Sequence, residues 1–161
     1  MTSTKSVTAA LRLALWAESA ADLMMSNPMS IRADATVREA VEALTDHGFS
    51  AAPVIDEAGR PLGVVSRADI LVHDREKAAG QGAAPGERPE PGSPAGALDT
   101  TRVRDIMTPA VFSVRPVTPA ASVVEQMVEL KVHRLYVVEE DGTLVGVITT
   151  LDVLRHLRPE V

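Results

Sequence analysis

Apolar residues recur with helical spacing in two segments of the chain. Within residues 37–44 and again within residues 120–127, an apolar side chain returns every three or four positions, which predicts one buried helix face in each segment. Thr36 and Glu39 form a capping box before the first helix, and Gly48 ends it. Thr118 and Pro119 suit the start of the second helix.

Two short apolar runs follow each of these helices. Residues 52–55 and 62–65 flank an Asp-Glu-Ala-Gly turn, and residues 135–138 and 144–148 flank a turn that contains Asp-Gly. An Asp-Gly pair between apolar runs is a strong hairpin signal. We therefore expect two strands joined by a tight turn in each half, followed by a further helix.

The two halves are copies of one unit. A shift of 83 residues, which carries Asp69 onto Asp152, superimposes the halves without a gap. Other residues of the first half that meet an identical residue in the second include Asp22, Met24, Ser30, Arg32, Glu42, Val54, Gly59 and Gly63. Because a unit of this size cannot bury its apolar faces alone, we expect the copies to pack against each other.

The segments outside the two copies differ from them in composition. Residues 80–96 hold nine Gly and Pro together, so residues 78–100 are expected to form a flexible linker. Leu11, Leu15 and Trp16 have helical spacing, and Arg12 interrupts the apolar run, which favours an amphipathic helical extension over residues 1–18 rather than a secretory signal. Residues 19–77 and 101–161 are then the two repeats.

Composition narrows the classes of partner. The net charge of −6 disfavours a nucleic-acid surface, and the 2% of aromatic residues provides no stacking platform for single strands. No apolar run approaches the ~20 residues that span a bilayer. The absence of Cys removes disulfides and the usual zinc frameworks, and is consistent with a reducing, cytoplasmic location.

No constellation typical of catalysis stands out. The chain shows no Ser-His-Asp order, paired carboxylate pocket or glycine-rich phosphate loop. His47, His73 and His156 fall near predicted helix ends, where the helix dipole favours His, so a metal site is disfavoured. We expect neither an enzyme nor a required cofactor or metal.

Each copy ends with a strand, a hydroxyl residue and an Asp three positions later. Residues 63–70 are Gly-Val-Val-Ser-Arg-Ala-Asp-Ile, and residues 146–153 are Gly-Val-Ile-Thr-Thr-Leu-Asp-Val. Unpaired backbone N–H groups at a helix start favour phosphate, and Ser66 or Thr149 adds a hydroxyl donor. The same pattern also caps a helix without any ligand, which stabilises it by roughly 1 kcal/mol. The residues alone leave both interpretations open.

Further side chains can complete a ligand site at these junctions. An Asp carboxylate can accept both hydrogens of a ribose cis-diol. Val64 and Ile148 are candidates for an apolar wall beside a base, and Thr150 stands where the first copy has Arg67. The side chains that can neutralise phosphate are Arg67, His133 and Arg134.

The duplicated motif resembles the tandem CBS pair, a family named after cystathionine β-synthase. Asp22-Leu23-Met24 and the segment from Asp105 to Pro109 resemble the opening of the family's repeats as well. The resemblance implies an α/β (α+β) fold in which two β-α-β-β-α repeats pack with pseudo-twofold symmetry, an arrangement called a Bateman module. It also implies a regulatory function without catalysis.

The resemblance further implies binding of AMP, ADP, ATP or S-adenosylmethionine in the cleft between the repeats. Asp69 and Asp152 would hold the ribose hydroxyls, and Ser66 and Thr149 would contact ribose or phosphate. The residues that would border the base pocket are Ile31, Pro53 and Val114. Tyr136 departs from the family's pattern, because it takes the position that corresponds to Pro53, where the family commonly has proline.

A homodimer is the expected assembly by the same resemblance, with a regulated partner protein as a further expectation. In the nucleotide-sensing hypothesis, ligand binding shifts the packing of the dimer. The alternative is a ligand-independent module for dimerisation or protein interaction, which is motivated by the apolar N-terminal segment.

Overall fold

The computed structural model of the chain describes residues 11–80 and 100–160. The elements of the first half are β1 (Leu13–Leu15), α1 (Ala20–Leu23), β2 (Met25–Ser26), β3 (Ile31–Arg32), α2 (Val37–His47), β4 (Ala51–Ile55), β5 (Pro61–Ser66) and α3 (Arg67–Gly80). Those of the second half are α4 (Val103–Ile106), β6 (Ser113–Val114), α5 (Ala120–Leu130), β7 (Arg134–Val138), β8 (Leu144–Thr149), α6 (Thr150–Arg155) and β9 (Leu157–Pro159).

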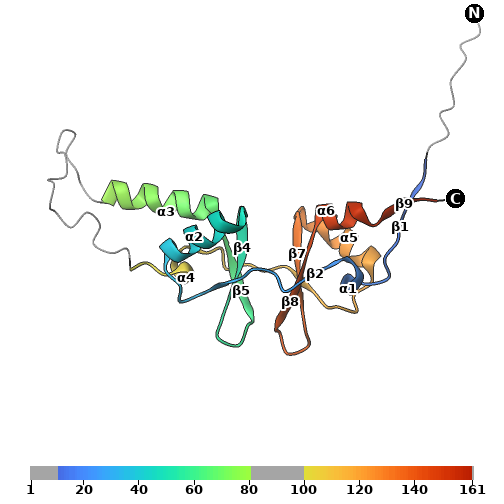
Figure 1. The fold of residues 1–161 in the computed structure, drawn as a ribbon, viewed down its shortest axis with the longest axis horizontal. Helices are drawn as coiled ribbons and strands as arrows, with labels where there is room; N and C mark the ends of the chain where they lie inside the picture. Colours follow the sequence, from blue (N-terminus) through green and yellow to red (C-terminus); the bar gives the residue numbers. More distant parts are fainter. Residues whose placement is uncertain (1–10, 81–99, 161) are drawn as a thin grey trace, which may run out of the picture.

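Each half is a small sheet with helices on one face. The first sheet has the order β3-β4-β5, and the second has the order β2-β8-β7-β6. In both, a parallel pair (β3 with β4, β6 with β7) continues into an antiparallel hairpin. The two sheets face each other in the middle of the molecule, and the helices lie on the outer sides (Figure 1). This arrangement confirms the predicted α/β fold.

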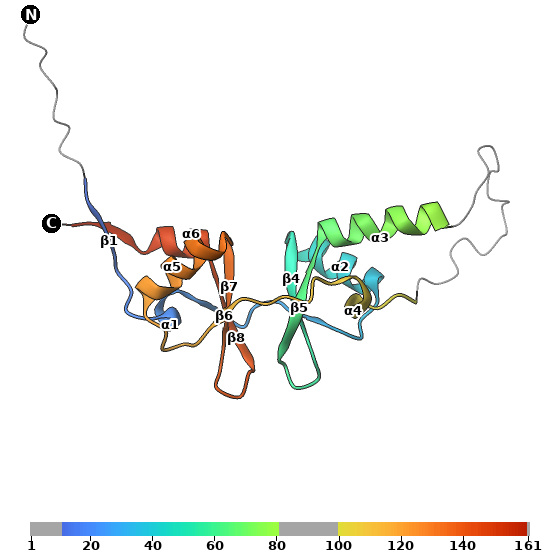
Figure 2. The same ribbon diagram turned by 180° about the vertical axis from the view of Figure 1, so that it is seen from behind.

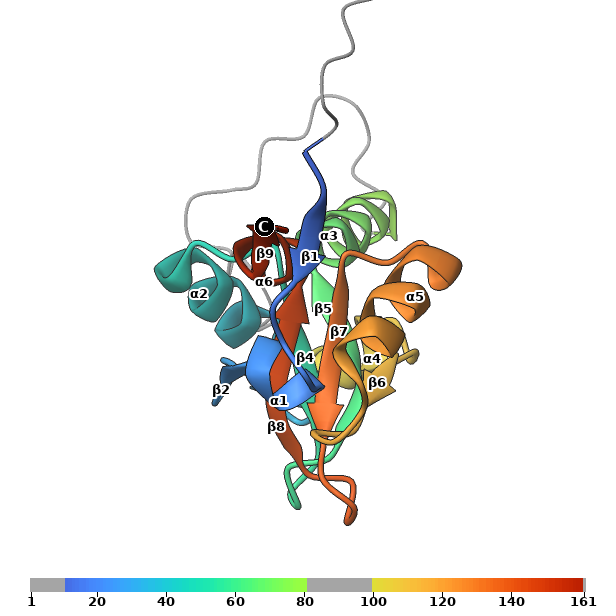
Figure 3. The same ribbon diagram turned by 90° about the vertical axis from the view of Figure 1, so that its right-hand side faces the viewer.

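Local signals predicted the main helices and hairpins, except that Thr118 does not cap α5: Pro119 takes the cap position, and the Thr118 hydroxyl accepts from the Arg115 N–H at 3.0 Å. The Thr36 hydroxyl accepts a hydrogen bond from the Glu39 N–H at 3.1 Å, and Gly48 ends α2 with a φ of 65°. The hairpin turns contain Gly59 and Gly142, whose positive φ angles of 79° and 89° suit glycine. Both hairpin turns lie at the same end of the molecule (Figure 3), where the Leu144 N–H donates to the Gly59 carbonyl.

The two halves exchange their opening segments. Ala20 and Leu23 of α1 are buried in the core of the second half, whereas Val103 of α4 is buried in the core of the first. Figure 2 shows α1 beside α5 and α4 beside α2. The strand β2 pairs with β8, and Thr108 makes the equivalent bridge to Val64 through two hydrogen bonds of 2.9 Å. Each core is therefore completed by a segment of the other copy.

The N-terminal helix prediction is wrong for residues 11–18. Residues 13–15 form β1, which pairs antiparallel with β9. The ladder continues on both sides, because the Trp16 N–H donates to the His156 carbonyl and the Glu160 N–H donates to the Arg12 carbonyl, each at 2.8 Å. The chain beyond α6 offers backbone groups to pair with, and apolar spacing alone does not reveal this distant partner. Residues 1–10 lie outside the described residues.

The linker prediction is tested only at its edges. The helix α3 continues to Gly80, so residues 78–80 of the expected linker are helical. Residues 81–99 lie outside the described residues. Among the helices that the structure describes, none is long and apolar enough to cross a membrane.

The exchanged segments pass so close to two strands that only glycine fits. A Cβ on Gly63 would lie 2.5 Å from the Thr108 carbonyl oxygen, whereas a Cβ on Gly146 would lie 2.5 Å from the sulfur of the Met24 side chain. The Thr108 carbonyl accepts from the Val64 N–H, and the Thr108 N–H donates back to Val64, so this backbone oxygen cannot easily move away, whereas a Met side chain can change rotamer.

We therefore expect Gly63→Ala to lower the free energy of unfolding by about 1–3 kcal/mol, and by more than its structural equivalent Gly146→Ala. Urea denaturation of both variants beside the original chain measures the difference. Equal stability of the two variants would contradict the close backbone contact at Thr108.

Candidate functional site

A groove of about 510 Å³ lies between the facing sheets. Its walls come from the segment that joins β2 to β3, from the end of α2, and from β4, β7 and β8. The lining residues are Met25, Ser26, Asn27, Pro28, Met29, His47, Phe49, Ala51, Pro53, Arg134, Tyr136, Val147 and Thr149. Both repeats therefore contribute to one site.

Strand register divides the groove into a polar row and an apolar row. Arg134 of β7 is paired with Thr149 of β8. Two residues further along β7, on the same face of the sheet, Tyr136 is paired with Val147. Val147 is in turn paired with Met25 of β2. One end thus offers a guanidinium and a hydroxyl, and the other end offers apolar walls together with the ring of Tyr136.

Thr149 and Asp152 form a helix cap at the polar end. The Asp152 Oδ2 atom accepts hydrogen bonds from the Thr149 N–H at 2.8 Å and from the Thr149 hydroxyl at 2.9 Å. Only 5% of the Asp152 surface is exposed, and the Arg155 guanidinium lies 3.9 Å from its other oxygen. The capping interpretation of this motif is therefore realised, which leaves Oδ1 as the oxygen free of the cap. Thr149 lines the groove, whereas Asp152 lies behind it.

The first repeat contains the same cap at the equivalent position. The Ser66 N–H and hydroxyl both donate to Asp69 Oδ2 at 2.9 Å. Asp69 is more exposed than Asp152, and neither Ser66 nor Asp69 is among the lining residues of the groove. The two predicted Asp residues do not meet in one cavity.

The predicted cations separate into different places. Arg134 faces the groove, where its Nη1 atom lies 3.5 Å from the Ala51 carbonyl. His133 and Thr150 instead line a second groove of about 400 Å³ beside α5 and α6, and Arg67 donates from Nε to the Phe49 carbonyl at 3.0 Å. His133 and Arg134 diverge because successive residues of an extended chain point to opposite sides.

The same alternation decides which apolar candidates reach the groove. Ile31, Val114 and Ile148 are buried in the two cores between sheet and helices, at 5%, 5% and 0% exposure. Val147 lines the groove instead of Ile148. The shift of 83 residues carries Val64 onto Val147, so the repeat itself contained the signal for this residue. Of the apolar candidates, Pro53 lies where the sequence placed it, and Val64 bridges to Thr108.

Two parts of the groove were not assigned from the sequence. Residues 25–29 line it because β2 crosses to the other half, and no local pattern indicates that crossing. Tyr136 was noted only as a departure from the family pattern, yet it is 3% exposed and its hydroxyl has no hydrogen-bond partner among the described residues. Burial raises the pKa of this hydroxyl, and the neighbouring Arg134 opposes the rise by its positive charge and as a nearby donor.

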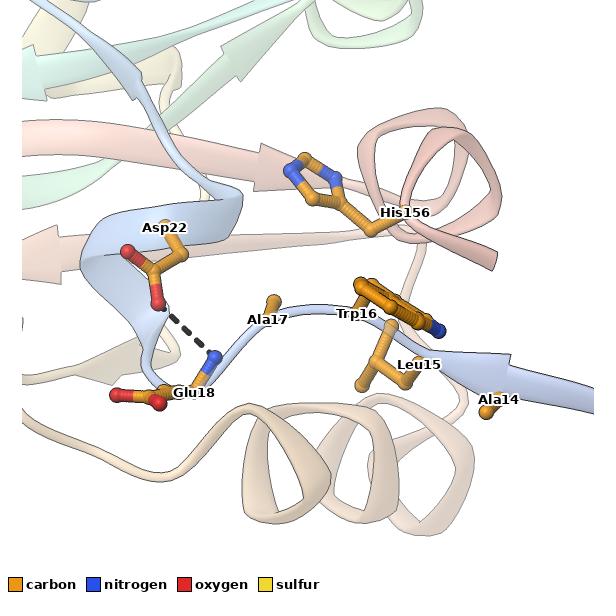
Figure 4. Close-up of a pocket in the computed structure, with 7 residues that line it drawn as sticks. All are labelled: Ala14, Leu15, Trp16, Ala17, Glu18, Asp22 and His156. Carbon is orange, nitrogen blue, oxygen red and sulfur yellow. Dashed lines mark hydrogen bonds between the residues drawn. The ribbon is translucent and has the colours of Figure 1, made fainter. Parts of the chain in front are cut away.

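A third cavity, of about 630 Å³, lies at the outer end of the second half beside β1 (Figure 4). It is lined by Ala14, Leu15, Trp16, Ala17, Glu18, Asp22 and His156. Hydrogen bonds from the Glu18 and Ser19 backbone N–H groups hold the pKa of Asp22 below its usual range, and the charge of His156 adds to this effect. The cavity contains none of the predicted site residues. No group of three potential metal ligands occurs within residues 11–80 and 100–160.

The chain belongs to the CBS domain family, whose profile matches residues 20–76 and 103–159. It is 33% identical to the CBS domain-containing protein CBSX1 of Arabidopsis thaliana over 135 residues. This alignment covers 78% of this chain and 57% of CBSX1. It is 32% identical to the magnesium transporter MgtE of Thermus thermophilus over 148 residues. This alignment covers 89% of this chain and 28% of MgtE. The chain thus spans less than two thirds of either relative.

Two similar solved structures contain a nucleotide. The structure of CBSX2 in complex with AMP superimposes with a TM-score of 0.65 at 27% identity, over 86% of this chain and 95% of that one. The cytosolic domain of MgtE in complex with ATP superimposes with a TM-score of 0.64 at 30% identity, over 86% of this chain and 48% of that one.

The buried cap predicts unequal effects of the two Asp substitutions without any ligand. We expect Asp152→Ala to lower the free energy of unfolding by about 1–2 kcal/mol, because the half-buried N–H and hydroxyl of Thr149 lose a buried acceptor. Asp69→Ala should cost less, since Asp69 is more exposed than Asp152 and water can more easily take its place. Urea denaturation without nucleotide tests this order, and a larger loss for Asp69→Ala would contradict it.

Proposed function

We propose that this protein is a non-catalytic regulatory module that binds an adenosine-type nucleotide in the groove between its two repeats. The ligands that we consider are AMP, ADP, ATP and S-adenosylmethionine. One observation carries the proposal: a single groove of about 510 Å³ joins a polar row with a hydroxyl and a guanidinium to an apolar row. The AMP and ATP complexes of the similar structures support it.

The two rows suggest how a nucleotide is held. The base packs against Met25, Pro53 and Val147, where apolar surface is removed from water. The ribose and phosphate then extend toward Arg134 and Thr149. The Arg134 guanidinium donates to phosphate oxygens, and the Thr149 hydroxyl, whose own hydrogen is donated to Asp152, accepts from a ribose hydroxyl. Asp152 lies behind the groove with its Oδ1 atom paired to Arg155, so in this arrangement it holds Thr149 in place, and its contact with the ribose stays a prediction. For Ser66, Arg67 and Asp69, an equivalent contact on the other side of the repeat pair stays a prediction.

A nucleotide titration tests this function directly. Isothermal titration calorimetry of the purified chain should show binding of at least one of the four ligands, and Val147→Trp should abolish it by filling the apolar row. His133→Ala is the matched control, because His133 lies one residue from Arg134 but lines another groove. Absence of binding by all four ligands, or unchanged binding by Val147→Trp, would overturn the proposal.

Exposed apolar residues on the helices favour self-association as a second function. Leu71 and Val72 of α3 are 67% and 55% exposed, and Leu151 and Leu154 of α6 are 53% and 55% exposed. Both helices run along the same edge of the molecule (Figure 1). An apolar edge of this kind fits a second copy of the chain, which is the proposed homodimer. The expected partner protein and the cytoplasmic location stay predictions.

The dimer is tested at that edge. We expect the original chain to elute as a dimer, and the pair of substitutions Leu71→Asp and Leu154→Asp to convert it to a monomer, because charges would be buried in the interface. Light scattering after size exclusion measures the mass. Val117→Asp is the control, since Val117 is 83% exposed but precedes α5 outside any helix. A monomeric original chain would contradict the dimer.

A further inference from the structure

The hydroxyl of Tyr136 is a polar group that the fold itself does not use. The side chain is 3% exposed, and no described residue forms a hydrogen bond with the hydroxyl. A buried donor without a partner destabilises the folded chain, because its hydrogen bonds to water are lost and not replaced. A Phe at position 136 would fill almost the same volume without this cost. A ligand that accepts a hydrogen bond from the hydroxyl would explain why the residue is Tyr.

The guanidinium of Arg134 lies near this hydroxyl, and most of its N–H donors are available to a ligand. Arg134 stands two residues before Tyr136 on the same face of β7, and both line the groove. Arg134 opposes the rise in the pKa of the Tyr136 hydroxyl both by its charge and as a nearby side-chain donor, although the two groups form no hydrogen bond of normal geometry. The hydrogen bond from Arg134 to the Ala51 carbonyl is long, at 3.5 Å, so the guanidinium is weakly held and can turn toward an anion.

The charges of the groove limit how much anion it can accept. Arg134 is the only Lys or Arg among the lining residues, and they include no Asp or Glu. The remaining basic side chain, His47, is turned toward its own helix, where Nδ1 lies 2.9 Å from the Ala43 carbonyl and the ring stacks on Phe49. One fixed positive charge matches one phosphate group, and it leaves a triphosphate largely unneutralised. The same charge repels the sulfonium of S-adenosylmethionine.

We propose that the Tyr136 hydroxyl and the Arg134 guanidinium form a clamp for a single phosphate group, which makes the groove selective for a nucleoside monophosphate. The hydroxyl donates its hydrogen to one phosphate oxygen, while the guanidinium donates to another. The inference rests on the proposed function and adds to it a ligand class and a selecting residue. Pro53, the equivalent of Tyr136 in the first repeat, has no group that can take this part.

Tyr136→Phe separates the clamp from a merely structural role, because it should act in opposite directions on stability and on binding. The unliganded variant should melt at a higher temperature than the original chain, since a buried unpaired hydroxyl is removed. Its affinity for AMP should fall about tenfold or more, as expected for loss of a hydrogen bond to a charged group. Its affinity for adenosine, which lacks the phosphate, should not change.

A double-mutant cycle tests whether both side chains hold the same phosphate. Calorimetric titrations with AMP, adenosine and ATP are made on the original chain, Tyr136→Phe, Arg134→Met and the double variant. For AMP, the combined loss should differ from the product of the two single losses, and for adenosine every variant should bind alike. His133→Ala is again the matched control and should bind AMP like the original chain.

The outcomes distinguish failure of the clamp from failure of the proposed function. Unchanged AMP affinity in Tyr136→Phe, an equal loss for AMP and adenosine, or tighter binding of ATP than of AMP by the original chain would overturn the clamp and leave nucleotide binding intact. Absence of binding by every nucleotide to the original chain would overturn both. A lower melting temperature of unliganded Tyr136→Phe would show that the hydroxyl has a structural partner, and would also overturn the clamp.

Discussion

The reciprocal exchange of opening segments is the constraint on which the rest of the structure depends. Neither small sheet can bury its outer face with its own two helices alone, and the missing cover comes from the other copy: Leu23 for the second half and Val103 for the first. The crossing chains must pass between the halves, so they bring backbone against Gly63 and Gly146 and fix the distance between the two sheets. The groove exists because this distance is held from both ends.

Strand alternation then determines which side chains serve stability and which reach the groove. On β7, Leu135 and Val137 are fully buried in the core, while Arg134 and Tyr136 between them face the other half. A single strand therefore belongs to the core on one face and to the site on the other. Because the core face pins the register, the polar row and the apolar row of the groove keep their relative positions without any ligand.

The sequence predicted the features that local signals encode. The cap at Thr36, the turn at Gly142 and the buried stripes of α2 and α5 are each set by residues within one element, and the repeat doubled every signal. The pairing of β1 with β9 and the crossing of β2 depend on partners more than a hundred residues away, which periodicity cannot reveal. For the site, Thr149, Arg134 and Pro53 were predicted, but Ile148 was chosen over Val147 because the faces of β8 were not assigned.

Duplication also forces the two copies to differ where they meet. Arg134 contacts Ala51, and these residues are equivalent under the 83-residue shift, so they lie where the pseudo-twofold axis passes between the sheets. A guanidinium at both positions would place two like charges side by side, and two large side chains would compete for the same space. This conflict is absent here, because Arg134 lies beside the small Ala51, and the large Tyr136 lines the same groove as its smaller equivalent Pro53. The two repeats therefore differ in sequence beside the axis, and the second repeat supplies Arg134, Tyr136 and Thr149 to the shared groove.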